Sequence, residues 1–240
     1  MAPENVDFEA FYRGEEPIEG TNISFGQIPW DIGEPQPALV HLEETGQIRG
    51  AVLDSGCGLG DNSVFLAARG YQVTGIDGAS GAIERAEQRA RDRGVDVEFR
   101  QADVTRLDGI EQRFNTVLDS ALYHCLGEGQ RAEYAAALHR VTMPGAQLHL
   151  FCFADAAPVQ FGGVTAVSQD DLYANLGQHW NITSIQLTNY VTAFTRESFR
   201  EQVNVEAMEQ AGLAFDIDNL DTDDQGRILG PVWQLHAERI

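Results

Sequence analysis

Long apolar runs are missing from this sequence. No stretch of the 240 residues comes near the run of about 20 apolar residues that a membrane helix needs. The amino end, MAPENVDFEA, contains neither the basic region nor the apolar core of a secretory signal. We therefore expect a cytoplasmic protein with no membrane partner.

Cysteine is also scarce. Cys57, Cys125 and Cys152 are an odd number and include no C-x-x-C pair, so they indicate neither a disulfide framework nor a zinc site. The run DTDDQG, Asp221 to Gly226, resembles the start of a calcium-binding loop, but Val232 stands where the twelfth position of that loop needs glutamate. The sequence therefore predicts no metal site.

Basic residues are few. The chain has 16 lysines and arginines against 37 aspartates and glutamates, and its net charge is −21. Such a chain repels nucleic-acid phosphates and anionic lipid surfaces, so we expect no nucleic-acid partner. A solvated acidic surface accounts for most of this charge without any function. With 43% hydrophobic residues the chain can still bury a full core, and we expect one α/β domain over residues 1–240.

What the sequence does contain is a regular alternation of apolar runs and helical patterns. Helical patterns lie at residues 61–70, 80–94 and 128–141. Between and around them, five apolar runs predict strands: AVLD from residue 51, YQVTGID from 71, VDVEFRQAD from 95, FNTVLDS from 114 and AQLHLFCFAD from 146. This order is typical of βαβ units in a parallel sheet.

The flanking regions predict further elements. FEAFYRG, residues 8–14, has the pattern of a short amphipathic helix, and Pro37 can open a second helix that Gly46 ends. We expect MPGA, residues 143–146, to be the turn that starts the fifth strand. The remaining expected elements are a helix capped by Ser168, a strand over 181–194, one helix over 196–212 and a last strand over 230–240.

Aspartate ends all five of these strands, at Asp54, Asp77, Asp103, Asp119 and Asp155. The carboxyl ends of parallel strands share the edge where doubly wound sheets bind their ligands, so we expect negative charge to gather there. Such an edge favours a cation, such as the sulfonium and ammonium of S-adenosylmethionine, over a pyrophosphate dianion. Aspartate is also a good helix N-cap after a strand, which explains any one of the five equally well.

A glycine-rich turn joins the first strand to a helix. Gly56, Gly58 and Gly60 form G-x-G-x-G after Asp54, whereas the nicotinamide fingerprint G-x-G-x-x-G needs a glycine where Asp61 stands. Glycines let the backbone approach a ligand closely, and the following helix N-terminus favours a carboxylate. The spacing therefore disfavours a nicotinamide oxidoreductase.

Asp77 ends the second strand 21 residues after Gly56. An acidic residue at this spacing accepts hydrogen bonds from both ribose hydroxyls of an adenosine. Together with the acidic edge, this combination predicts that the glycine turn binds the amino-acid end of S-adenosylmethionine.

These motifs resemble those of a known family. VLDSGCGLGDNSVFLAARGYQVTGID resembles motif I and its acidic partner in class I S-adenosylmethionine-dependent methyltransferases, and QADVT and FNTVLDSALYHCL resemble that family's adenine-contact and fourth-strand motifs. IPWDIGEPQPALVHL is similar to the P-W-D-x-G-x-x-x-P segment of the thiopurine, halide and thiol methyltransferase branch. The whole chain resembles the mycobacterial heterocyclic toxin methyltransferases, which O-methylate hydroxyquinolone-type compounds.

The resemblance implies a Rossmann-like class I methyltransferase fold. This fold is a seven-stranded, mostly parallel sheet with helices on both faces, an antiparallel last strand and an N-terminal helical cover. Residues 1–48 would form the cap and substrate cover, 49–155 the cofactor-binding core, and 156–240 the C-terminal strands and substrate-side elements.

The resemblance also implies roles at the cofactor. The glycine turn would pass beside the methionine moiety, Asp77 would hold the ribose, and Asp119 would lie near the methionyl ammonium. An aromatic face at Trp30 can attract the sulfonium, although this tryptophan can equally anchor the N-terminal segment to the core. The implied cofactor-binding residues are Trp30, Asp54, Gly56, Cys57, Gly58, Gly60, Asp77, Asp103, Val104 and Asp119, with Asp103 and Val104 reading the adenine.

The methyl acceptor should meet the cofactor after the fourth strand, where Tyr123 and His124 stand. Because the pKa of histidine suits removal of a hydroxyl proton, we name His124 as the candidate base, with Tyr123 beside it. A lone histidine in an apolar segment is also often a hydrogen-bonded structural residue.

Candidate walls of the acceptor pocket are aromatic and suit a flat apolar heterocycle. They are Phe11, Tyr12, Trp30, Tyr123, Phe153 and Phe161, of which Phe11 can equally be core. The favoured function is methylation of a hydroxyl on a small aromatic or heterocyclic molecule. Thiol, thiopurine or halide methylation and non-catalytic cofactor binding are the alternatives, and the oligomeric state stays open.

Overall fold

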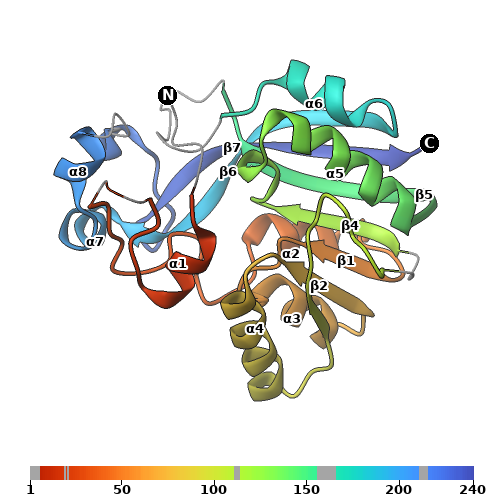
Figure 1. Ribbon diagram of the computed structural model, residues 1–240, viewed down its shortest axis with the longest axis horizontal. Helices are drawn as coiled ribbons and strands as arrows, with labels where there is room; N and C mark the ends of the chain where they lie inside the picture. The colour runs from red at the N-terminus through yellow and green to blue at the C-terminus, as the bar shows by residue number, and fades with distance from the viewer. Residues whose placement is uncertain (1–5, 19, 21, 111–113, 156–165, 211–215) are drawn as a thin grey trace.

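A seven-stranded sheet forms the centre of the protein, with the strand order β3-β2-β1-β4-β5-β7-β6 (Figure 1). The computed structural model describes residues 6–18, 20, 22–110, 114–155, 166–210 and 216–240. The strands are β1 (Val52–Ser55), β2 (Val73–Asp77), β3 (Glu98–Gln101), β4 (Phe114–Ser120), β5 (Thr142–Phe153), β6 (Trp180–Thr195) and β7 (Arg227–Arg239).

The direction of the strands agrees with the prediction. β1 to β5 run parallel, and β7 lies antiparallel between β5 and β6. The register places Ser55 of β1 opposite Ile76 of β2 and Asp119 of β4. The carboxyl ends of these three strands therefore lie side by side, and the expected class I sheet with its reversed last strand is confirmed.

Helices cover both faces of the sheet. Successive side chains of a strand point to opposite faces, so apolar side chains are available for packing on both. Leu148 and Leu150 of β5 belong to an apolar cluster with α5 and α6, whereas Phe151 belongs to a cluster with α2 and α3. The helices are α1 (Phe8–Arg13), α2 (Pro37–Glu44), α3 (Asp61–Ala68), α4 (Ser80–Arg93), α5 (Glu128–Val141), α6 (Gln169–Leu176), α7 (Arg196–Gln202) and α8 (Val205–Gln210), with 3-10 turns η1 (Tyr123–Cys125) and η2 (Ile217–Asn219).

Two predicted boundaries are wrong. The single helix expected over residues 196–212 is divided into α7 and α8, because Val203 between them forms a β-bridge with Phe25 and Gln202 O accepts a bond from Gly26 N at 3.0 Å. The turn MPGA lies inside β5 and does not precede it: β5 pairs with β4 at Thr142, and the register resumes at Gln147. This stretch is an irregularity within a longer strand.

The long strands β6 and β7 extend beyond the rest of the sheet. Figure 1 shows α7 and α8 at this end of the molecule, with α1 nearby. A separate apolar cluster, which includes Ile23, Phe194, Phe199, Met208 and Ile228, joins the N-terminal segment to these C-terminal elements. Within the described residues, no helix is both long and apolar enough to cross a membrane.

Candidate cofactor site

The glycine turn between β1 and α3 lies at the carboxyl edge of the sheet. Gly56, Gly58 and Gly60 all have positive φ angles, of 71°, 51° and 82°, which side chains disfavour. A Cβ added at Gly56 would lie 2.7 Å from Leu122 Cβ, and one at Gly60 would lie 2.9 Å from Ala86 Cβ. Packing against the protein itself therefore requires these two glycines.

Gly58 has a different environment. A Cβ at this position would meet the Tyr12 hydroxyl at 3.4 Å and the Trp30 Nε1 at 3.7 Å, both ordinary or slightly tight contacts with the N-terminal segment. The neighbouring Cys57 is buried, and its backbone N–H donates to Ile76 O at 2.9 Å. Of the three glycines, Gly58 is thus the one at which a side chain would point toward Tyr12 and Trp30.

Asp77 connects the glycine turn to the start of α4. Its Oδ2 accepts from Gly58 N and its Oδ1 from Ala79 N, both at 2.9 Å. Burial raises the pKa of Asp77, and the nearby carboxylate of Glu9 adds to the rise while these backbone bonds oppose it. The predicted ribose ligand is therefore a half-buried carboxyl beside Gly58.

Asp54 and Asp119 are fully buried carboxyls below the turn. Asp54 Oδ2 accepts from Ser63 Oγ at 2.6 Å, while its Oδ1 is buried with no hydrogen-bond partner. Burial raises the pKa of Asp54 to about 6, and the charge of Asp77 adds to the rise. An unpartnered buried acceptor is costly, so the site is suited to a ligand that brings a donor or a positive charge.

Asp119 is held by the chain itself. Its Oδ1 accepts from Leu122 N at 2.9 Å and Tyr123 N at 3.3 Å, and its Oδ2 accepts from the Tyr134 hydroxyl at 2.9 Å. Burial nevertheless raises the pKa of Asp119 to about 7, with a smaller contribution from Asp54. The charge of Asp77 thus raises the pKa of Asp54, and that of Asp54 raises the pKa of Asp119, which is the electrostatic setting that a cation relieves.

The other two strand-end aspartates lie further out. Asp103 is exposed beyond β3 and accepts from Thr105 N and Thr105 Oγ, at 2.9 and 2.7 Å. Val104 is buried in the main apolar cluster. Asp155 follows β5, and its N–H donates to Val167 O at 3.1 Å.

An aromatic cover lies over the glycine turn. Trp30 packs against Phe8, Phe11 and Tyr12, with ring centroids 5.9, 4.9 and 6.4 Å away. Burial raises the pKa of the Tyr12 hydroxyl, and so does the charge of Asp77. Both readings of Trp30 therefore agree with its position, since it anchors α1 and also stands beside Gly58.

Glu9 fixes this cover to the core, and the sequence analysis missed it. Its carboxylate accepts from Gly81 N at 3.1 Å and from Ser80 Oγ at 3.4 Å, at the first turn of α4. A carboxylate is favourable at this end of a helix. No pattern in the sequence marks this role of Glu9, because Ser80 and Gly81 lie more than 70 residues away.

Tyr123 and His124 are buried in η1, directly after β4. The Tyr123 hydroxyl donates to Asp171 Oδ1 at 2.9 Å, and the Arg131 guanidinium, which pairs with the same carboxylate at 2.7 Å, lies over the Tyr123 ring. Tyr123 is thus tied to α6, with its hydroxyl bonded to a carboxylate.

His124 accepts a hydrogen bond from Phe153 N at its Nδ1, at 3.2 Å, and its ring lies against that of Phe153, tilted by 37° with 4.3 Å between centroids. The neutral ring therefore carries its proton on Nε2. Burial, followed by the nearby charge of Arg131, lowers the pKa of His124 to about 3. These contacts favour the structural alternative over proton removal. Phe161 lies outside the described residues.

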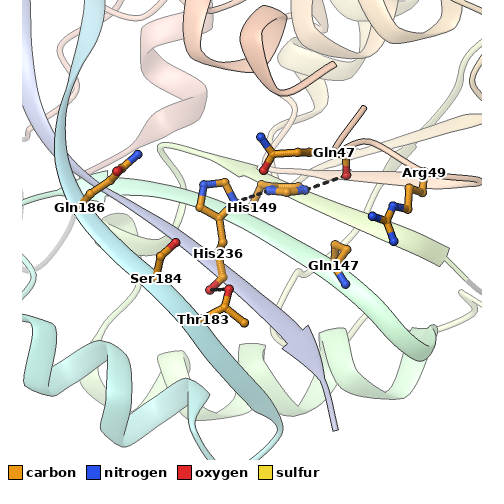
Figure 2. Close-up of a pocket in the computed structure, with 8 residues that line it drawn as sticks. All are labelled: Gln47, Arg49, Gln147, His149, Thr183, Ser184, Gln186 and His236. Atoms are coloured by element: carbon orange, nitrogen blue, oxygen red, sulfur yellow. Dashed lines mark hydrogen bonds between the residues drawn. The ribbon is translucent and has the colours of Figure 1, made fainter. Parts of the chain in front are cut away.

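A hollow of about 350 Å³ lies elsewhere, on the face of β5 that also carries Phe151 (Figure 2). In it, His149 Nδ1 and His236 Nδ1 are 2.8 Å apart across a directly paired register position. The hollow is lined by Gln47, Arg49, Gln147, His149, Thr183, Ser184, Gln186 and His236. None of the residues predicted for the cofactor or acceptor lines it.

Known proteins share these features. Residues 52–145 match the sequence profile of a methyltransferase domain. The chain is 36% identical over 180 residues to the 2-heptyl-1-hydroxyquinolin-4(1H)-one methyltransferase of Mycobacteroides abscessus. This alignment covers 74% of this chain and 78% of that protein. It is 29% identical over 131 residues to the probable thiol methyltransferase 2 of Arabidopsis thaliana, 53% of this chain and 58% of that one.

A solved structure agrees over nearly the whole chain. The structure reported as "Conversion of a Disulfide Bond into a Thioacetal Group during Echinomycin Biosynthesis" superposes with a TM-score of 0.73 at 32% identity, covering 97% of this chain and 90% of that one. These matches support a methyltransferase over the nicotinamide oxidoreductase and the non-catalytic binding protein. The glycine turn, the carboxyls and the comparisons lead to one conclusion: the chain belongs to the class I S-adenosylmethionine-dependent methyltransferases, and S-adenosylmethionine is its cofactor.

Proposed function

We propose that this enzyme methylates a hydroxyl group on a small aromatic or heterocyclic acceptor of the hydroxyquinolone or phenol type. The observation that carries the proposal is the aromatic cover of Phe8, Phe11, Tyr12 and Trp30, which lies against Gly58 beside buried carboxyls. Flat aromatic side chains suit a flat apolar ring. The M. abscessus relative, which is named for a hydroxyquinolone, supports this class of acceptor.

S-adenosylmethionine supplies a methyl group attached to a positively charged sulfur. We assign Asp77 to the ribose, and Asp54 and Asp119 to the negative charge that attracts the sulfonium and ammonium. Tyr12 and Trp30 would exclude water and hold the acceptor against the methyl carbon, which is most of what an in-line methyl transfer requires. Asp103 and Val104 keep their proposed place at the adenine.

The acceptor's proton is the remaining requirement. We keep Tyr123, His124 and Phe153 as residues beside the acceptor, with His124 in a positioning role. A base whose pKa is about 3 takes up a proton poorly near neutral pH. The enzyme should therefore favour acceptors that ionise without help, and an N-hydroxyl or an acidic phenol meets this requirement.

The test is the production of S-adenosylhomocysteine with three matched acceptors: a 1-hydroxyquinolin-4-one, the same ring without the N-hydroxyl, and a thiophenol. We expect turnover with the first and none with the second. Equal turnover of the first two would contradict methylation of the N-hydroxyl.

A thiol acceptor is the second candidate. It is supported by the 29% identical thiol methyltransferase relative, and a thiol also ionises easily without a strong base. Faster turnover of the thiophenol than of the hydroxyquinolone would replace the first proposal with this one. For either acceptor, we propose a cytoplasmic enzyme without a nucleic-acid partner, which the net charge of −21 supports.

A further inference from the structure

A half-buried arginine joins the aromatic cover to the core. Arg89 of α4 places its Nη2 2.9 Å from both carboxylate oxygens of Asp31, and its Nη1 bonds to the carboxylate of Asp61. The side chains of Arg89, Asp31 and Asp61 are only 27%, 18% and 22% exposed. One guanidinium thus bridges two carboxylates that belong to different segments of the chain.

Those two segments meet at the cofactor site. Asp31 directly follows Trp30, whose indole nitrogen stands beside Gly58, and Asp61 directly follows the glycine turn as the first residue of α3. Arg89 therefore fixes the distance between the aromatic cover and the turn.

Other contacts of this segment lie on either side of Trp30. Ala193 N donates to Pro29 O at 2.8 Å, Gln36 N donates to Asn62 Oδ1 at 3.1 Å, and Glu34 pairs with Arg227 at 2.7 Å. Arg89 is the guanidinium that links Asp31, the residue next to Trp30, to α3 and α4.

We propose that Arg89 is a positioning residue that holds Trp30 against the glycine turn and thereby sets the affinity for S-adenosylmethionine. A planar guanidinium can serve two carboxylates at once, whereas a lysine ammonium is a single point charge on a flexible stem. This role needs no acceptor, so it holds whether or not the proposed acceptor is right.

The sign of the effect separates positioning from simple electrostatics. Arg89→Met makes the site more negative, which by charge alone should tighten the binding of a cationic cofactor. If Arg89 positions Trp30, the same substitution weakens binding instead. Asp31→Asn, which removes a negative charge, should weaken binding to a similar extent because it breaks the same link.

The experiment is calorimetric binding of S-adenosylmethionine to the full chain, without acceptor. We expect Arg89→Met and Asp31→Asn each to weaken affinity about fivefold or more, the double variant to be no worse than the weaker single variant, and Arg89→Lys to lie between Arg89→Met and wild type. Arg91→Met is the matched control, since Arg91 lies on the same helix in an exposed pair with Glu87, and its affinity should not change.

Tighter or unchanged binding in Arg89→Met, or losses that multiply in the double variant, would overturn the proposal. If Arg89→Met does not fold, the test is made on Asp31→Asn, by measuring the hydrogen exchange of its backbone amides. Amides of residues 27–31 should then exchange faster than in wild type, and wild-type exchange together with wild-type affinity would also overturn it.

Discussion

The buried carboxyls predict that cofactor affinity depends on pH. In the free enzyme the pKa of Asp54 is about 6, because burial disfavours its charge, so at pH 5 this carboxyl is mostly protonated. A bound cation favours the ionised form, and binding must then release a proton. If the cofactor returns the pKa of Asp54 to about 4, affinity falls about tenfold between pH 7 and pH 5. Asp119, with a pKa of about 7, acts in the same direction.

Calorimetry in buffers of different ionisation enthalpy measures this directly. We expect about 0.8 proton to be released at pH 5 by Asp54 alone, from the same two pKa values. Asp54→Asn should bind more weakly at pH 7 and lose the part of the pH dependence that Asp54 contributes, while the part from Asp119 remains. Asp108→Asn, which changes one exposed charge paired with Arg106, should keep the wild-type dependence. Affinity that is flat between pH 5 and 7, or binding without proton release, would refute the reasoning.

Three other predictions follow from the same geometry. Asp77→Ala should weaken S-adenosylmethionine binding by about 2 to 4 kcal/mol, since it removes two charge-assisted bonds to the ribose as well as the bonds to Gly58 and Ala79; unchanged affinity in calorimetry would remove Asp77 from the site. His124→Phe should lower kcat by one common factor for phenols of graded acidity, because His124 positions the site; a loss confined to phenols that are neutral at the assay pH would restore its role as a base. Burial and the neighbouring His236 lower the pKa of His149 to about 4, below its unfolded value, so His149 alone should lower folding stability by about 2 kcal/mol as the pH drops from neutral to 5. His149→Gln should lose less stability over that interval in thermal unfolding, and an equal loss in both proteins would contradict this assignment.

The sheet could be predicted from the sequence because its signals are local. Apolar runs of four to ten residues, alternating with helix patterns, set the order of β1 to β5. Ser168 caps α6 as expected by accepting from Asp171 N at 3.1 Å. The glycine turn and Asp77 were equally visible, since their spacing along the chain sets their meeting at the sheet edge.

The remaining features depend on contacts that no local pattern records. Gly60 is constrained by Ala86 and Phe99, and His124 by the backbone of Phe153, so their roles are decided by residues 26 to 39 positions away. The break between α7 and α8 has the same origin, because Phe25 pairs with Val203 from the other end of the chain. Helical propensity alone continues through that position.

The pairing of Phe25 with Val203 also has a consequence for the order in which the enzyme is assembled. During synthesis the cover segment leaves the ribosome long before its partners Ala193, Gln202 and Val203 exist. The glycine turn and Asp77 can meet once β1 and β2 have formed, but the cover has no β6 or α7 to pair with until some 170 further residues have been made. A growing chain would therefore form its acidic edge early and the contacts of the cover segment with β6 and α7 last. The amino end would remain available to non-native contacts for most of translation.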